Sequence, residues 1–462
     1  MNPHIFREYD IRGIVAEDLG GSVAEDIGRA FGSELRARLG DRAGGGRERL
    51  RVALGHDNRP TSPELAEGVI AGLRAVGVDV LFVETVPTPL LYYATKHFDT
   101  DGGLQITGSH NPPEYNGFKM VARDGSIYGE TIQRLRERIE RRDYATGQGG
   151  LETHDVIGPY LDEVGGKFSL EEPVKVVVDC GNGAGSLVAV DLLERIGADV
   201  VPLFCESDGT FPNHHPDPVV DENLVDLIDR VKSERAALGI AFDGDADRIG
   251  VVDEKGRIVR GDILLLLYGL DYIDRHGPGA EMIFDVKCSQ AVPEVFEKAG
   301  GRPVMWKTGH SLIKERMKQT GAPIAGELSG HICFAEDYYG YDDALFGACR
   351  ITEMVARWEE PISAHTDAFP QYVSTPELRV DVPEERKFDI VEDAVAHFKR
   401  DHDVIDVDGA RVLFDGGWGL LRASNTQPVL VLRFEARDAE RLEKIRGTFE
   451  DWLRAQGVAV GR

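Results

Sequence analysis

The chain has 462 residues, of which 42% are hydrophobic and 29% are charged, and its formal net charge is −27. At about 150 residues per domain, this length predicts three or four domains. So strong a negative charge repels nucleic acid and anionic membrane surfaces, which excludes both as general partners and requires any phosphate site to be locally basic.

The longest apolar run, residues 263–270, is far shorter than the about 18 residues that a membrane helix needs. The first residues contain no continuous apolar segment typical of a secretory signal, so we expect a cytoplasmic protein. The acidic excess, with Arg preferred over Lys, also suggests adaptation to high salt. The cysteines lack CxxC spacing, which argues against a disulfide framework and a thiolate zinc site, and we expect them to be reduced and structural. They are Cys180, Cys205, Cys288, Cys333 and Cys349.

Apolar runs rich in β-formers alternate with segments of helical period through most of the chain, which predicts α/β layers. The first such unit has strands at residues 51–54 and 78–83 around a helix at 63–73. A second has strands at 175–178 and 200–204 around a glycine-rich turn and a helix at 186–196. A third begins near residue 258 and includes strands at 282–286 and 324–326.

Thr107-Gly108-Ser109-His110-Asn111-Pro112 follows the apolar run 104–106. Glycine permits backbone conformations that other residues resist, and Asn-Pro ends the turn. The segment therefore predicts that the Ser109 hydroxyl is presented at a junction between a strand and a loop. The alternative is an ordinary Ser/Asn turn without chemistry.

Asp243, Asp245 and Asp247 alternate with small residues between two predicted strands, 238–242 and 249–253. A spacing of two places all three carboxylates on one side, and oxygen ligands suit a hard cation such as Mg²⁺. A calcium EF-hand loop is excluded because it needs glycine where this chain has Arg248. A solvated acidic turn is the alternative, but three adjacent like charges are costly without a cation.

Residues 326–331 contain Glu327, Ser329 and His331 within five positions after a predicted strand. A carboxylate and a hydroxyl can bind vicinal sugar hydroxyls, and a histidine can contact phosphate or carry protons. A helix-capping loop is the alternative. Lys119, Lys287, Lys307 and His310 each lie in or after a turn, and each taken alone is expected at the surface.

The last part of the chain predicts a smaller α+β domain, with strands at 416–421 and 429–434 and a closing helix whose apolar face contains Leu442, Ile445, Phe449 and Leu453. Between the strands, residues 422–426 combine a guanidinium, hydroxyls and an amide, which favours a phosphate site over a plain turn. Linker-like segments divide the chain into predicted domains at 1–150, 151–255, 256–370 and 371–462.

Together these segments resemble the α-D-phosphohexomutase family, in particular its phosphomannomutase/phosphoglucomutase group. Residues 6–13 resemble the group's opening motif, 107–112 its phosphoserine loop, 243–248 its metal loop, 326–331 its sugar-binding loop and 422–426 its phosphate-binding loop. Phosphoglucosamine mutases rank second, because they typically open with Gly-Thr-Asp-Gly and carry Gln where this chain has Leu328.

The resemblance implies three related α/β domains with mixed sheets and a C-terminal α+β domain around a central cleft. It also implies a phosphoserine at Ser109, Mg²⁺ held by that phosphoserine and the three aspartates, and a hexose 1,6-bisphosphate intermediate between hexose 1-phosphate and 6-phosphate. Glucose and mannose phosphates are the implied substrates, and a monomer or weak homodimer is expected. The implied catalytic residues are Ser109, His110, Lys119, Arg248, His310 and His331.

The implied substrate-binding residues are Tyr9, Arg12, Lys287, Lys307, Glu327, Ser329, Arg422, Ser424, Asn425 and Thr426. Lys119, His310 and His331 are alternative acid/base groups. Two functions of another class stay open, a metal-dependent sugar phosphatase and a sugar-phosphate binding protein without turnover.

Overall fold

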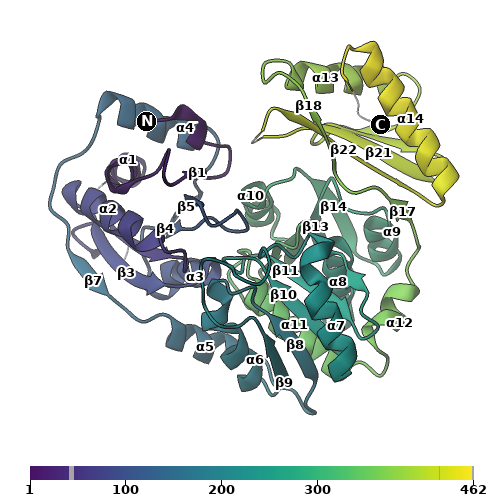
Figure 1. Ribbon diagram of the computed structural model, residues 1–462, viewed down its shortest axis with the longest axis horizontal. Coiled ribbons are helices and arrows are strands. Elements are labelled where there is room, and N and C mark those ends of the chain that lie inside the picture. Colours follow the sequence, from purple (N-terminus) through teal and green to yellow (C-terminus); the bar gives the residue numbers. More distant parts are fainter. Residues whose placement is uncertain (41–45, 426, 460–462) are drawn as a thin grey trace.

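The computed structural model describes residues 1–40, 46–425 and 427–459. Its strands form four sheets of seven, five, four and six strands, in that order along the chain. The four sheets belong to four successive domains, and the last of these stands apart from the others as a separate lobe (Figure 1).

The first sheet has the strand order β1-β5-β4-β2-β3-β7, with β6 beside β5. Strands β4, β2, β3 and β7 are parallel, whereas β5 pairs antiparallel with both β4 and β1. In the β4–β5 pair, Gln105 lies opposite Lys119. The elements are η1 (Pro3–Ile5), β1 (Ile11–Ile14), α1 (Gly21–Leu39), β2 (Arg51–His56), α2 (Ser62–Ala75), β3 (Asp79–Thr85), α3 (Thr88–His97), β4 (Gly102–Ile106), β5 (Tyr115–Ala122), β6 (Gly125–Ser126), α4 (Glu130–Arg141) and β7 (Leu151–Thr153).

The second and third sheets repeat this topology with fewer strands. Their orders are β12-β11-β10-β8-β9 and β14-β13-β15-β16. In all three sheets the earliest parallel strand lies between the next two, and the third of them pairs antiparallel with the strand that follows it. This recurrence confirms the prediction of three related α/β domains with mixed sheets.

The second domain contains α5 (Ile157–Gly165), β8 (Lys175–Asp179), η3 (Ala184–Leu187), α6 (Ala189–Arg195), β9 (Asp199–Leu203), η4 (Asp221–Leu224), α7 (Val225–Glu234), β10 (Leu238–Phe242), β11 (Ile249–Asp253) and β12 (Ile258–Val259). The third contains α8 (Gly261–His276), β13 (Glu281–Asp285), α9 (Ala291–Lys298), β14 (Arg302–Trp306), α10 (His310–Thr320), β15 (Ile324–Gly326), β16 (Ile332–Phe334), α11 (Ala344–Arg357) and α12 (Ile362–Asp367).

Strands of the first and second sheets continue past two of the predicted domain boundaries. Strand β7 pairs with β3, so the first sheet extends to Thr153, past the predicted boundary at residue 150. Strand β12 pairs with β11, so the second sheet extends to Val259, past residue 255. Residues 254–257 form the turn of that hairpin, where the Asp253 carboxylate accepts hydrogen bonds from the backbone of Lys255 and Arg257.

The fourth sheet is antiparallel, with the order β17-β22-β21-β20-β19 and β18 beside β22. Helix α14 begins at an N-cap aspartate, Asp438, whose side chain accepts the backbone N–H of Arg441. The predicted apolar face of this helix is buried. The elements are β17 (Val373–Ser374), β18 (Leu378–Asp381), α13 (Lys387–Phe398), β19 (Val404–Ile405), β20 (Ala410–Phe414), β21 (Gly417–Ala423), β22 (Val429–Ala436) and α14 (Ala439–Ala455).

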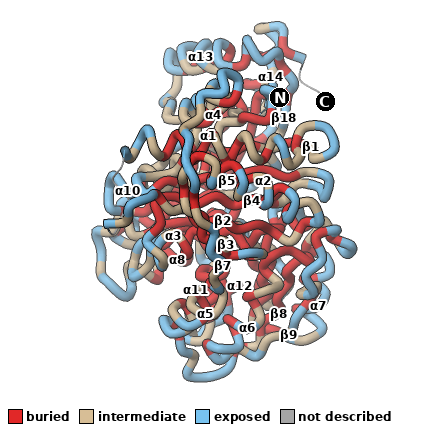
Figure 2. The backbone as a smooth tube through the Cα atoms, turned by 90° about the vertical axis from the view of Figure 1, so that its left-hand side faces the viewer, coloured by how far each residue is buried: buried red, intermediate tan, exposed pale blue. Residues whose placement is uncertain are grey.

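The apolar cores explain why the fourth domain stands apart. One continuous core runs through the first three domains, from Leu81 through Val178 to Phe346. The fourth domain has its own core, which includes Phe398 and Phe449. In Figure 2 the central strands of the first sheet are mostly buried and the outer helical turns are exposed. No described helix is long and apolar enough to span a membrane.

Candidate active site

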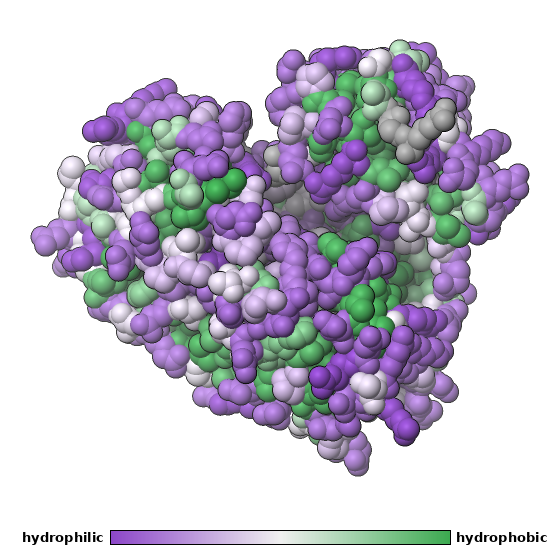
Figure 3. All heavy atoms as spheres, viewed as in Figure 1, coloured by the Kyte–Doolittle hydropathy of each residue, from purple (hydrophilic) through white to green (hydrophobic). Residues whose placement is uncertain are grey.

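The three predicted loops of the α/β domains occupy the same topological position. Residues 107–114 join β4 to β5, residues 243–248 join β10 to β11, and residues 327–331 join β15 to β16. Each loop therefore leaves the carboxyl end of a parallel strand, where α/β folds commonly bind ligands. The space-filling view shows a notch between the lobe that carries α1 and α4 and the lobe that carries α13 and α14 (Figure 3).

Ser109 lies directly beyond β4 in a left-handed backbone conformation, with φ of 49°. Its N–H donates to the Thr107 hydroxyl oxygen at 2.8 Å, and Ser109 is only 2% exposed. A non-glycine residue in this conformation is strained unless its surroundings hold it there. The serine thus lies at the junction between a strand and a loop, as the sequence predicted, but the expectation that it is presented rather than packed is wrong, because Ser109 is buried against the aspartate loop.

Arg59 and Asp57 hold this loop from beneath, and sequence reasoning did not select either. The Arg59 guanidinium donates to the carbonyl oxygens of Ser109 and Asn111 at 2.7 and 2.6 Å. The Asp57 carboxylate accepts the Gly108 N–H at 3.1 Å. A Cβ on Gly108 would lie 2.5 Å from the guanidinium carbon, so glycine is required here. Their position in a turn directly after a predicted strand was the available signal.

The aspartate loop lies against the serine loop. The Ser109 hydroxyl donates to the Asp243 carboxylate at 2.8 Å, and a Cβ on Gly244 would lie 2.4 Å from the Ser109 carbonyl oxygen. Asp243, Asp245 and Asp247 are fully buried and offer oxygens within 4.8 Å of one another. The structure therefore brings together the serine of one domain and the three carboxylates of the next.

These carboxylates have the donor set of a hard-cation site. One oxygen of Asp245 and one of Asp247 are buried without a hydrogen-bond partner among the described residues. Burial and the charges of Asp245 and Asp247 raise the pKa of Asp243 well above its usual range. Because unpaired buried carboxylate oxygens are costly, the arrangement fits a divalent cation with oxygen ligands.

Lys119 is buried, which corrects the expectation that it lies at the surface. Its ammonium group donates to Asp245 at 2.7 Å and also contacts Asp247. Burial acts to lower the pKa of Lys119, but these carboxylates raise it above its usual range. Lys287 is buried as well and donates to Glu377 at 2.9 Å, whereas Lys307 is exposed beyond β14. Lys119 and Lys287 can be buried because carboxylates that lie far away in the sequence compensate their charges.

His310 and His331 share one carboxylate, that of Asp342. Their Nδ1 atoms lie 2.8 and 3.1 Å from the same Asp342 oxygen, and their rings stack with centroids 5.1 Å apart. The Arg248 Nε–H donates to His331 Nε2 at 3.0 Å. Because a guanidinium can only donate, His331 accepts at Nε2 and carries its proton on Nδ1, toward Asp342. No sequence motif marked Asp342, which lies in the loop between β16 and α11.

His110 and Arg12 flank the serine. His110 Nδ1 lies 3.2 Å from the Ser109 hydroxyl oxygen. Burial and the positive charge of Arg248 lower the pKa of His110 well below its usual value. Arg12 donates to the side chain of Asn111 in the same loop and pairs with Asp10.

Glu327 is buried, and its carboxylate accepts the backbone N–H of Gly309 at 2.7 Å. Burial raises the pKa of Glu327 above its usual value. Ser329 is half-buried in the turn between β15 and β16. The loop at residues 326–331 thus places an acidic group in the same region as His310, which follows Gly309.

The fourth domain contributes the hairpin loop between β21 and β22. Arg422 donates to Asp408 at 3.0 Å, and the Ser424 hydroxyl oxygen accepts the backbone N–H of Gln427 at 3.2 Å. The Asn425 amide donates to the Tyr9 hydroxyl at 2.6 Å, and that hydroxyl donates to the Thr308 carbonyl at 2.8 Å. These two bonds connect the first, third and fourth domains. Thr426 lies outside the described residues.

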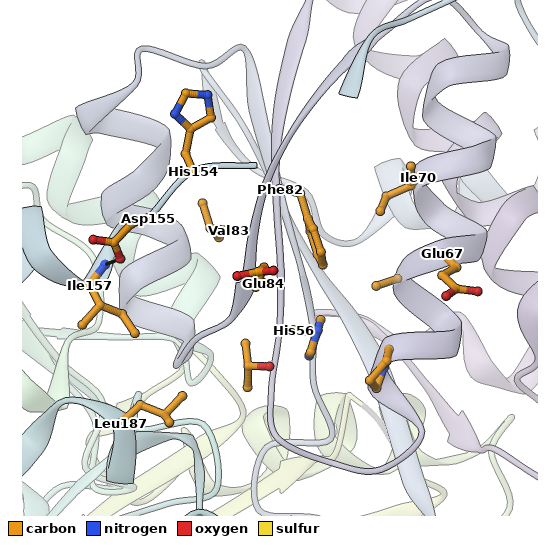
Figure 4. A pocket seen from close by; sticks show the side chains of 13 residues that line it. His56, Glu67, Ile70, Phe82, Val83, Glu84, His154, Asp155, Ile157 and Leu187 are labelled. Carbon is orange, nitrogen blue, oxygen red and sulfur yellow. Dashed lines mark hydrogen bonds between the residues drawn. The ribbon is translucent and has the colours of Figure 1, made fainter. Parts of the chain in front are cut away.

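A separate cavity of about 590 Å³ lies around the end of β3, between α2 and residues 154–157 (Figure 4). His56, Glu67, Phe82, His154 and Leu187 are among the residues that line it. None of the candidate site residues lines this cavity, so it is distinct from the site described above.

Sequence comparisons identify the family. Four domain models described as phosphoglucomutase/phosphomannomutase, namely alpha/beta/alpha domains I, II and III and the C-terminal domain, match residues 3–146, 158–256, 260–372 and 377–451. The chain belongs to the phosphoglucomutase/phosphomannomutase family of enzymes. This family lies within the α-D-phosphohexomutases, which confirms the resemblance predicted from the motifs.

Individual relatives match over nearly the whole chain. A phosphomannomutase/phosphoglucomutase of Pseudomonas aeruginosa is 48% identical over 456 residues, covering 98% of this chain and 96% of that protein. A phosphoglucomutase of Neisseria gonorrhoeae is 44% identical and covers 96% of each. The crystal structure of a family member from Burkholderia thailandensis has a TM-score of 0.90 at 43% identity and covers 98% of both chains.

Proposed function

We propose that this phosphohexomutase interconverts the 1-phosphates and 6-phosphates of glucose and mannose through a phosphoserine at Ser109. A phosphoryl group passes from Ser109 to the free hydroxyl of a hexose monophosphate and gives a hexose 1,6-bisphosphate. The bisphosphate reorients, and its other phosphoryl group returns to the Ser109 oxygen. The oxygen–phosphorus bond broken in one transfer is thus formed again in the other.

One observation supports the proposal most directly. The backbone of Ser109 has a left-handed conformation, and its hydroxyl lies 2.8 Å from the Asp243 carboxylate, beside two further buried carboxylates. A purely structural turn would not need three desolvated carboxylates against a hydroxyl, because their mutual repulsion is unfavourable. Phosphoryl transfer does need such a group of ligands, since it depends on positioning and on charge neutralisation.

Asp243, Asp245, Asp247 and an oxygen of the phosphorylated Ser109 would hold Mg²⁺. When bound, this ion supplies positive charge that neutralises the phosphoryl oxygens. Lys119 is held by Asp245 and Asp247 at the same place, so its ammonium group contributes further positive charge toward the phosphoryl group. The guanidinium of Arg248, which donates a hydrogen bond to His331, adds a third positive charge.

Glu327 and Ser329 are proposed to bind the 3- and 4-hydroxyls of the sugar in either orientation, which leaves the 2-hydroxyl loosely read. Arg422, Ser424, Asn425 and Thr426 are proposed to bind the phosphate that does not react. Lys287 and Lys307 supply cationic groups near this path, and Tyr9 and Arg12 complete its wall. The bond from Asn425 to Tyr9 supports this assignment, because it brings the fourth domain to the first.

His331 is the acid/base candidate that the geometry favours. Asp342 orients its Nδ1, and Arg248 contacts its Nε2, so both the tautomer and the ring orientation are fixed. His310 shares Asp342 but also lies near Lys314, which binds the second Asp342 oxygen at 2.7 Å. Lys119 is committed to two carboxylates, which makes it a better source of charge than of base.

The decisive experiment follows the conversion of glucose 1-phosphate and mannose 1-phosphate to their 6-phosphates by ³¹P NMR, with Mg²⁺ and a trace of the matching 1,6-bisphosphate. We expect both sugars to turn over. Release of inorganic phosphate in place of 6-phosphate would favour a phosphatase. Preference for glucosamine 1-phosphate would favour a phosphoglucosamine mutase, and binding without turnover would favour a binding protein. We expect the activity in the cytoplasm and a monomer or weak homodimer.

A further inference from the structure

Cys180 and Cys205 form a thiol pair at the start of a segment that contacts the aspartate loop. Cys180 follows β8 and Cys205 lies two residues beyond β9, and these two strands are parallel neighbours. The two sulfur atoms lie 3.1 Å apart. Their wide separation in the sequence gave no CxxC signal, so the expectation that all cysteines are merely structural missed this contact.

The local backbone brings the two thiols together. The N–H of Cys180 donates to the carbonyl of Leu203 at 3.2 Å, and the N–H of Asn182 donates to the carbonyl of Phe204 at 2.8 Å. Neighbouring strands lie about 4.8 Å apart, which is within the roughly 4.4–6.8 Å range of Cα separations in disulfides. Asn182 and Phe204 both have positive φ angles, so the turns that present the thiols are conformationally unusual.

The two thiols differ in accessibility. Cys180 is fully buried, whereas Cys205 is partly exposed. Contact with the Cys180 sulfur also lowers the pKa of the Cys205 thiol below its usual value. A partly exposed thiol in contact with a buried thiol is the arrangement of a redox-sensing pair, in which the first sulfur reacts with the oxidant and the second forms the disulfide with it.

We propose that Cys180 and Cys205 are a reversible oxidation site that couples the redox state of the chain to its active-site loops. With a peroxide as oxidant, the Cys205 sulfur attacks one peroxide oxygen, the O–O bond breaks, and water and a sulfenic acid form. The Cys180 sulfur then attacks the Cys205 sulfur, the S–S bond forms, the S–O bond breaks, and a second water leaves. The two thiols are oxidised and the peroxide is reduced.

Closing the disulfide would displace the loop that begins at Cys180. A disulfide bond is about 2.05 Å long, so the sulfurs must approach by roughly 1 Å. The same loop contacts the aspartate loop and the segment that carries Arg59. The N–H of Ala184 donates to the carbonyl of Gly244 at 2.9 Å, in the aspartate loop. The side chain of Asn58, next to Arg59, donates to the carbonyl of Asn182 at 2.7 Å.

The test treats the fully reduced chain with hydrogen peroxide and reads three signals: the crosslinked peptide by mass spectrometry, hydrogen exchange of residues 243–248, and turnover of glucose 1-phosphate. We expect a Cys180–Cys205 crosslink, altered exchange in the aspartate loop, and a loss of kcat on the order of tenfold to a hundredfold, as for a displacement of about 1 Å. Dithiothreitol should reverse all three.

Two variants make the test specific. Cys205→Ser keeps a hydrogen-bond donor at this position and should keep the basal activity but resist peroxide. Cys349→Ala, at a buried thiol in α11, should respond like the parent chain. Absence of the crosslink, a crosslink without change in exchange or kcat, or equal sensitivity of Cys205→Ser would overturn the proposal. The crosslink and the hydrogen exchange are measured without substrate. The turnover of the reduced chain, measured before peroxide is added, tests the proposed function on which this inference rests.

Discussion

The side-chain amide of Asn425 donates a hydrogen bond of 2.6 Å to the hydroxyl of Tyr9, 416 positions earlier in the chain. The same hydroxyl donates to the carbonyl of Thr308 at 2.8 Å. A single oxygen atom therefore joins the first, third and fourth domains. The fourth domain has its own apolar core, so its placement over the others depends on such polar contacts together with one small apolar cluster, in which Val286 packs against Trp418 and Leu420.

Tyr9→Phe should weaken this junction without removing the aromatic ring. A hydrogen bond contributes about 1 kcal/mol net, so we expect KM for glucose 1-phosphate to rise about fivefold for each lost bond, with a smaller change in kcat. Steady-state kinetics measures both. Tyr144→Phe is the matched control, because its hydroxyl bonds to Asp26 within the first domain. Equal effects of the two variants would contradict the role of the junction.

Ser109→Ala should remove nearly all turnover and leave substrate binding, because it removes only the oxygen that we propose to carry the phosphoryl group. Binding of glucose 1-phosphate by calorimetry and the phosphorylation state by intact mass provide the two readouts. Ser233→Ala, on the exposed surface of α7, is the control and should match the parent chain. Turnover retained by Ser109→Ala would refute the assignment of the nucleophile.

Gly108→Ala should destabilise the chain and reduce its activity. The new methyl group would lie 2.5 Å from the Arg59 guanidinium, which is buried and bonded to the loop. Overpacking of this kind costs on the order of 1–3 kcal/mol. Gly447→Ala, in α14 with no atom within 4 Å of the new Cβ, should instead stabilise by up to about 1 kcal/mol. Urea unfolding compares the two, and a loss of stability in both would rule out the steric explanation.

Asp342→Asn should lower kcat more than it raises KM, because it loosens His310 and His331 together, whereas Glu327 stays bonded to the backbone N–H of Gly309. If the carboxylate acts through His331, His331→Gln combined with Asp342→Asn should be little worse than His331→Gln alone. The comparison of kcat in the two single variants and the double variant measures this coupling. Fully additive losses would show that the carboxylate acts independently.

His310 should make the chain less stable in mild acid. Burial and the charge of Lys314 lower the pKa of His310 from 6.5 to about 4. The unfolded chain therefore binds a proton that the folded chain does not between pH 6.5 and about 4, and stability falls as pH falls through this window. The ionisable groups near the ring include Asp342, Asp247, Lys314, His331 and Tyr9.

His310→Gln should reduce the pH dependence of the free energy of unfolding by up to about 3 kcal/mol, which is the free energy that corresponds to the shift in the pKa of His310. Urea unfolding at pH 7.5 and pH 4.5 gives the difference for each chain. His4→Gln, near the exposed N-terminus, should keep the slope of the parent. A slope unchanged in His310→Gln would mean that the ring titrates alike in the folded and unfolded chains.

The sequence located the strands around the aspartate loop at the residues where the structure has them, 238–242 and 249–253. Short buried apolar runs on either side of a polar turn leave little choice of boundary. The helix expected at 186–196 is instead split into η3 and α6, because residues 184–187 wind as a 3₁₀ turn.

The candidate site was predictable where it is made of local motifs and unpredictable where it is made of distant partners. Local sequence motifs were enough to select Ser109, Glu327 and the three aspartates. No local motif selects Arg59, Asp342 or Asp408. The role of an isolated charged residue depends on the side chains that the fold brings into contact with it. The burial of Lys119 follows in the same way from Asp245 and Asp247, which belong to the next domain.

The pairing of β4 with β5 has a consequence for how this chain can change. Side chains alternate between the two faces of a sheet, so a slip of one residue would move Lys119 to the opposite face, away from the aspartates of the second domain. Insertions in the loop between these strands, beyond Ser109, leave the pairing intact, whereas a single insertion within β5 before Lys119 does not. A hydrogen-bonded ladder in one domain thus sets the positive charge available beside the aspartate cluster of another.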